Sequence, residues 1–126
     1  MPRVLLVDDF PPMLERAADA LAATCDIVGA VQDGSTALHA AATLQPDVIV
    51  LDIALPDMSG FDVAARLKLV GSTAAVVFLT LYEEAETIEA AKAAGGLGYV
   101  VKRRLDAELA TAVHEARAGR PFVSKI

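Results

Sequence analysis

Aromatic residues are scarce in this chain of 126 residues: they make up 5% of it, and tryptophan is absent. The interior must therefore be filled by aliphatic side chains and alanine. Basic residues are also few, with 11 Lys and Arg against 17 Asp and Glu, which gives a formal net charge of -6. Because affinity for nucleic acid phosphates needs clustered Lys and Arg, we expect no direct nucleic-acid binding by this chain.

Cysteine and long apolar runs are missing as well. The single Cys25 cannot form an internal disulfide, which is typical of a reduced intracellular compartment. Only four apolar residues, Val4–Val7, precede the first carboxylates, too few for a signal peptide. No apolar run approaches the roughly 18 residues that span a bilayer. We expect a cytoplasmic protein without membrane contact and, at this length, one domain.

Short apolar runs alternate with segments of helical periodicity. Runs that are apolar throughout predict parallel strands buried on both faces. The predicted strands cover residues 3–7, 26–31, 47–52, 75–80 and 98–101, and the predicted helices cover residues 12–24, 34–45, 60–69, 84–94 and 105–118. Five βα units of this size predict an α/β fold of the flavodoxin-like type, a three-layer sandwich around a parallel five-stranded sheet of order 2-1-3-4-5.

Polar residues stand where these apolar runs stop. Asp8 and Asp9 follow the first predicted strand, Asp52 ends the third, and Thr80 and Lys102 stand at the ends of the last two. The carboxyl ends of parallel strands meet at one edge of a sheet, and ligands bind there in open α/β folds. Neighbouring strands about 4.8 Å apart would bring the three carboxylates within reach of one small cation.

Carboxylates crowded at one edge repel one another unless a cation lies between them. Oxygen ligands favour Mg²⁺ or Mn²⁺, whereas His39 and His114 fall on predicted helices, so a zinc site is not expected. An aspartate beside Mg²⁺ can attack phosphorus and form an aspartyl phosphate. The Thr80 hydroxyl and the Lys102 ammonium would then contact the phosphoryl oxygens.

Each of these residues also has an ordinary structural explanation. Asp9 could cap a helix, Asp52 could form a turn and Lys102 could be a solvated charge. Thr80 could simply end a strand. Taken singly these explanations are preferable, but five such positions at one edge of one sheet favour a site.

Four segments that contain these residues resemble the receiver domain of two-component response regulators (CheY-like): Val4–Asp9, Asp52–Gly60, Leu79–Thr80 and Gly98–Lys102. The similarity covers nearly the whole chain. Two longer segments resemble NarL/FixJ (LuxR)-type receivers, which usually carry a DNA-binding domain: Leu79–Glu84 and Ala93–Lys102. The resemblance implies a receiver domain over residues 1–118, and a tail over 119–126 that resembles the start of a linker to an effector domain absent from this chain.

The resemblance also implies a role for each site residue. Asp52 is the phosphoacceptor and binds Mg²⁺ directly together with Asp9. Asp8 acts mainly through metal-bound water, and the backbone carbonyl of Ala54 is a further metal ligand. The remaining residues act on or respond to the phosphoryl group: Thr80 and Lys102 contact it, and Tyr99 changes rotamer with activation.

The implied function is a phosphorylation-dependent signalling switch and not an enzyme with a separate substrate. A sensor histidine kinase or a phosphotransfer protein would phosphorylate Asp52, and the chain would catalyse only its own phosphorylation and dephosphorylation. The surface of the fourth helix, fifth strand and fifth helix would respond, by homodimerisation or by contact with a partner, and so control transcription through a DNA-binding domain.

Three alternatives stay open. A Mg²⁺-dependent phosphohydrolase could use an aspartyl phosphate, although haloacid-dehalogenase-type enzymes usually place a second Asp two residues after the nucleophile, where this chain has Ala54. A nucleotide or flavin binder would need a glycine-rich loop, and none follows the first strand. The chain could also be a constitutive binding module. One departure from the receiver pattern is Arg103, which stands where many receivers have a proline with a cis peptide bond, so such a bond is not expected here.

Overall fold

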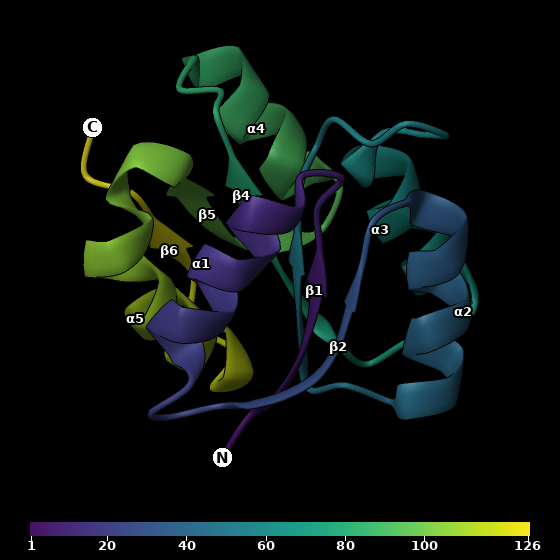
Figure 1. Cartoon of the computed structure of the whole chain (residues 1–126). Coiled ribbons are helices and arrows are strands. Elements are labelled where there is room, and N and C mark those ends of the chain that lie inside the picture. The colour runs from purple at the N-terminus through teal and green to yellow at the C-terminus, as the bar shows by residue number, and fades with distance from the viewer.

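A parallel sheet lies at the centre of the molecule, as the continuous apolar runs predict (Figure 1). The structure is a computed structural model that describes residues 1–126. The strands are β1 (Arg3–Val7), β2 (Asp26–Val31), β3 (Val48–Leu51), β4 (Ala75–Thr80), β5 (Gly96–Val101) and β6 (Phe122–Val123). Their order is β2-β1-β3-β4-β5-β6, and every neighbouring pair is parallel. The predicted flavodoxin-like fold and its 2-1-3-4-5 order are confirmed.

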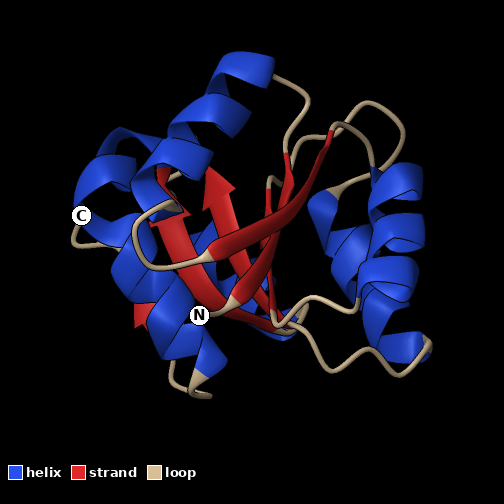
Figure 2. Cartoon of the chain, turned by 60° about the horizontal axis from the view of Figure 1, so that its bottom comes forward, coloured by secondary structure: helices blue, strands red, loops and turns tan.

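Helices cover both faces of this sheet, as Figure 2 shows with the strands in red between helices in blue. The helices are α1 (Pro11–Leu21), α2 (Gly34–Leu44), α3 (Gly60–Leu69), α4 (Ala85–Ala93) and α5 (Leu105–Arg117), with a short 3₁₀ helix η1 (Lys102–Arg104) before α5. Side chains of α1 and α5 pack on one face, and those of α2, α3 and α4 pack on the other. None of the helices has the length and apolar character needed to cross a bilayer.

The core is aliphatic, as the scarcity of aromatic residues requires. Alternate residues of each central strand face opposite layers: Val4 and Leu6 pack towards α1 and α5, whereas Leu5 and Val7 pack towards α2 and α3. Buried alanines let the helices lie close to the sheet, for example Ala112 of α5. This two-sided burial fixes the register of the strands, because a slip of one residue would exchange the two faces.

Several element bounds differ from the prediction by one to three residues, for example at β5, which begins at Gly96 and not at residue 98. Helix α1 ends at Leu21 and not at residue 24, because the N–H groups of Thr24 and Cys25 both turn back to the Leu21 carbonyl. The sheet also has one strand more than predicted, since β6 pairs with residues 98 and 99 of β5. A strand of two residues is too short to give a periodic pattern. The boundary at residue 118 between domain and tail stays a prediction.

Candidate functional site

Three aspartates meet at the carboxyl edge of the sheet. Asp8 follows β1 and Asp52 follows β3, and the two strands pair directly with Val7 opposite Leu51. One carboxylate oxygen of Asp8, of Asp9 and of Asp52 lies within 4.8 Å of the others. Asp9 does not cap α1: the residue at that position is Phe10, whose N–H donates to Asp8 Oδ1 at 2.9 Å. The arrangement therefore offers oxygen ligands to one small cation.

Lys102 is buried among these carboxylates and is not a solvated charge. It is 8% exposed, and its Nζ donates to Asp52 Oδ2 at 2.9 Å. The same Nζ forms an ion pair with Asp8 Oδ2 at 2.8 Å. One ammonium thus balances two buried carboxylates, and the Asp8 oxygen keeps bonding capacity for a further cation.

Burial and charge act against each other on the pKa values at this site. Burial raises the pKa of Asp52 and outweighs the hydrogen bond and charge of Lys102, while Asp8 raises it further. Burial alone would lower the pKa of Lys102, but its bonds to Asp8 and Asp52 outweigh burial and raise it. Lys102 therefore keeps its positive charge beside the carboxylates.

Thr80 ends β4 with an unpartnered hydroxyl. The residue is fully buried, and its Oγ1 has no hydrogen-bond partner. Beside it lies a cavity of ≈ 100 Å³ lined by six residues: Asp52, Ala54, Thr80, Leu81, Tyr82 and Lys102. Because a buried hydroxyl without a partner is costly, an acceptor in this cavity would be stabilised by it.

Tyr99 does not line the cavity but bonds to a residue that does. Its hydroxyl donates to the backbone carbonyl of Tyr82 at 2.7 Å, and the residue is 2% exposed. Burial, followed by the nearby charges of Glu84 and Glu83, raises the pKa of Tyr99 to about 12. Tyr99 thus contacts the loop between β4 and α4, and that loop forms one wall of the cavity.

Two groups of polar contacts near the site were not predicted from the sequence. Arg103 Nε and Nη2 each donate at 2.9 Å to a carboxylate oxygen of Glu83. The buried Glu108 carboxylate accepts bonds from the Ser124 hydroxyl and the Lys125 N–H, and Val101 N–H donates to Ser124 Oγ at 3.0 Å. These partners are 16 to 23 residues apart, so no local spacing reveals them.

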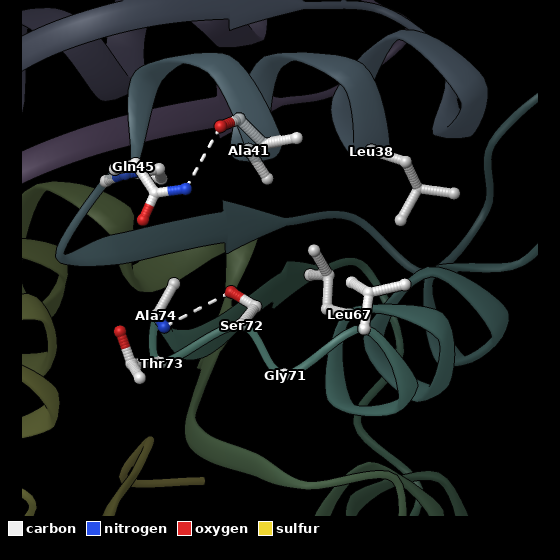
Figure 3. A pocket seen from close by; sticks show the side chains of 11 residues that line it. Leu38, Ala41, Gln45, Leu67, Gly71, Ser72, Thr73 and Ala74 are labelled. Carbon is white, nitrogen blue, oxygen red and sulfur yellow. Dashed lines mark hydrogen bonds between the residues drawn. The ribbon is translucent and has the colours of Figure 1, made fainter.

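The largest cavity lies at the opposite edge of the sheet. It has a volume of ≈ 250 Å³, and none of the residues that line it is charged. Figure 3 shows it with Leu38 and Ala41 from α2, Leu67 from α3 and Ser72 from the segment before β4. This cavity therefore offers no charged group, whereas the smaller cavity at the carboxyl edge is lined by Asp52 and Lys102.

Comparisons with known proteins agree with this geometry. Residues 4–114 match the model of the response regulator receiver domain family. The chain is 41% identical over 99 residues to TcrX of Mycobacterium tuberculosis, described as a probable transcriptional regulatory protein, and this covers 79% of the chain and 42% of TcrX. It is 36% identical over 125 residues to the DNA-binding transcriptional activator DevR/DosR of the same organism, which covers 98% of the chain and 58% of that protein. The chain thus spans about half the length of these relatives.

A solved structure shows the same fold. The chain superposes with a TM-score of 0.92 on a two-component response regulator of the LuxR family from Aurantimonas sp. SI85-9A1. The two are 27% identical, and the match covers 97% of this chain and 89% of that one. Together with the family match over residues 4–114, this places the chain in the response regulator receiver domain family, among receivers of the LuxR and NarL type.

Proposed function

We propose that this chain is a phosphorylation-dependent switch in which Asp52 accepts a phosphoryl group from a phosphohistidine of a sensor kinase or a phosphotransfer protein. An Asp52 carboxylate oxygen bonds to phosphorus while the bond from phosphorus to the histidine nitrogen breaks, and that nitrogen keeps the electron pair. The observation that carries this proposal is the unpartnered Thr80 hydroxyl beside the Lys102–Asp52 pair. Both groups are suited to bind phosphoryl oxygens.

Receiver domains generally bind Mg²⁺ at an acidic pocket, and the carboxylates of this chain suit that ion or Mn²⁺. Asp8, Asp9 and Asp52 would hold it together with the backbone carbonyl of Ala54. When bound, the ion would neutralise charge on the phosphoryl oxygens. Lys102 then moves its hydrogen bond from Asp52 to a phosphoryl oxygen, while Thr80 donates to another.

The surface formed by α4, β5 and α5 would change with phosphorylation and would bind a second copy of this chain or the next protein in the signalling chain. Tyr99 lies in β5 and contacts the loop that leads into α4, so a change at Thr80 can reach this surface. We propose that phosphorylation promotes a homodimer or a partner contact there, in the cytoplasm. Because the matched relatives are transcription regulators of about twice this length, we assign DNA binding to a region outside residues 1–118, reached through residues 119–126.

Acetyl phosphate supplies a direct test. Incubation with and without Mg²⁺, followed by intact mass measurement, should show Mg²⁺-dependent addition of one phosphoryl group to the wild-type protein and none to Asp52→Asn. Sedimentation with beryllium fluoride then tests the dimer. Phosphorylation that persists in Asp52→Asn, or that needs no divalent cation, would rule out the proposed site.

A further inference from the structure

One ion pair joins the loop after β4 to η1, the two segments next to the proposed phosphoryl contacts Thr80 and Lys102. Thr80 is the last residue of β4, and the loop of residues 81–84 follows it; Lys102 begins η1, and Arg103 comes next. Arg103 forms two parallel hydrogen bonds with Glu83, both 2.9 Å long. The pair therefore bridges the backbone just beyond Thr80 and the backbone just beyond Lys102.

The same loop has a second anchor. Tyr99 holds the carbonyl of Tyr82, so residues 82 and 83 are both fixed from the side of β5. Between these anchors and Thr80 lies Leu81, which is 73% exposed and lines the phosphoryl cavity together with Tyr82. The position of this wall thus depends on two bonds, of which only the Arg103–Glu83 pair is made by charges.

The geometry of the pair suits a positioning role. A guanidinium that binds a carboxylate through two parallel N–H groups fixes both distance and orientation, which a lysine cannot do. The Arg103 and Glu83 side chains are 52% and 38% exposed. Water and salt therefore screen the attraction, so its contribution is modest and depends on ionic strength.

We infer that Arg103 and Glu83 are positioning residues that hold the wall of residues 81–83 over the cavity and prolong the life of the phosphoryl group on Asp52. The inference rests on the proposed phosphorylation of Asp52 and goes beyond it, because neither side chain takes part in the transfer. With the pair intact, the wall restricts access of hydrolytic water to the phosphorus. Without it, Thr80 and Lys102 keep their bonds to the phosphoryl group while water enters more often.

The test follows decay of the phosphorylated protein. Each protein is phosphorylated with acetyl phosphate and Mg²⁺, freed of donor, and followed by intact mass. Arg103→Gln and Glu83→Gln should each lose the phosphoryl group about two- to fivefold faster than wild type, the range that a well-formed exposed ion pair can supply. The exchanged variant Arg103→Glu/Glu83→Arg should restore most of the lifetime. Added NaCl should shorten the wild-type lifetime and leave that of Arg103→Gln unchanged.

A matched control is Arg120→Gln, which breaks the equivalent pair with Glu115 at the end of α5 and should not alter the decay. An unchanged lifetime in Arg103→Gln, or no recovery in the exchanged variant, overturns the inference. Hydrogen exchange of the unphosphorylated protein separates the two proposals, because amides 81–84 should exchange faster in Arg103→Gln whether or not Asp52 accepts a phosphoryl group. If that exchange changes but the wild-type protein takes up no phosphoryl group, the proposed function fails and the lifetime role fails with it.

Discussion

Lys102 places its ammonium nitrogen between two carboxylates, 2.8 Å from Asp8 Oδ2 and 2.9 Å from Asp52 Oδ2. The three side chains come from the ends of β1, β3 and β5, which lie in the order β1-β3-β4-β5 in the sheet. The ammonium therefore contacts the acidic cluster, while Lys102 also lines the cavity beside Thr80. This arrangement means that the lysine stabilises the fold as well as the proposed chemistry.

Replacing Lys102 with Met should leave Asp8 and Asp52 buried without a counter-charge. Loss of one partner of a buried ion pair costs about 3–5 kcal/mol, so the free energy of unfolding should fall by that order at pH 7. Mg²⁺ should restore part of it, because a bound cation replaces the ammonium. Urea unfolding with and without MgCl₂ measures both effects. The exposed Lys68→Met is the control, and equal stabilisation by Mg²⁺ of wild type and Lys102→Met would contradict the shared-cation arrangement.

Thr80→Val should change the stability of the fold and the affinity for a phosphoryl analogue in opposite directions. Valine has the shape of threonine but removes a buried hydroxyl that has no partner, so the free energy of unfolding should rise by about 1 kcal/mol. Affinity for beryllium fluoride should fall, since a donor to the phosphoryl analogue is lost. Urea unfolding and a fluoride titration followed by NMR measure the two changes. Thr111→Val, on the exposed side of α5, controls for the substitution, and a destabilised Thr80→Val would show that the hydroxyl has a partner.

Tyr99 should make the folded protein less stable at high pH. Its folded pKa of about 12 lies above the ordinary value of 10.0, so the folded state holds the phenolic proton more tightly than the unfolded state. The stabilisation is complete below pH 10 and is lost as the pH rises towards 12. Tyr99→Phe, which also loses the bond to the Tyr82 carbonyl at a cost of about 1 kcal/mol, should remove this dependence. Urea midpoints between pH 8 and about 11 measure the difference, and parallel curves for the two proteins would argue against it.

Glu108 should have the opposite pH dependence. Burial alone would raise its pKa, but the bonds from Ser124, Lys125 and Arg104 outweigh burial and lower it below the ordinary value of 4.5. The contribution of Glu108 to the free energy of unfolding is therefore present above pH 4.5 and is lost as the pH falls through the lower folded pKa. Glu108→Gln should cost about 1–3 kcal/mol at neutral pH, and the difference from wild type should shrink below pH 4.5.

Urea unfolding from pH 7 downwards measures the Glu108 effect, with the exposed Glu86→Gln on α4 as the matched control. If the difference in unfolding free energy between wild type and Glu108→Gln stays constant on acidification, Ser124 and Lys125 do not bind an ionised Glu108 carboxylate. Hydrogen exchange should show a loss of protection at the Ser124 amide in Glu108→Gln, since the bonds of Glu108 to Ser124 and Lys125 hold the residues after β6 against β5.

The meeting of Asp8 and Asp52 was predictable from the sequence, because both follow apolar runs and the strand order makes those runs neighbours. The burial of Lys102 was harder to predict, since a charged residue after a strand gives the same sequence pattern whether it is solvated or buried. The Arg103–Glu83 pair joins the short helix η1 to the loop after β4, segments too short or irregular to show a hydrophobic period. Such contacts depend on how the two segments pack in three dimensions, which residue spacing does not reveal.

The bond from the Tyr99 hydroxyl to the Tyr82 carbonyl joins the only two tyrosines of a chain without tryptophan. Both tyrosines therefore lie close to the proposed phosphoryl cavity, because Tyr82 lines it and Tyr99 bonds to the backbone of Tyr82. Tyrosine emission depends on whether the hydroxyl is hydrogen-bonded and on whether the ring is exposed to solvent. A movement of the loop that carries Tyr82 would therefore change the emission. The two tyrosines are thus an intrinsic optical probe of the loop between β4 and α4, and binding of Mg²⁺ or a phosphoryl analogue at the proposed site should be measurable by fluorescence on the unlabelled, unmutated protein.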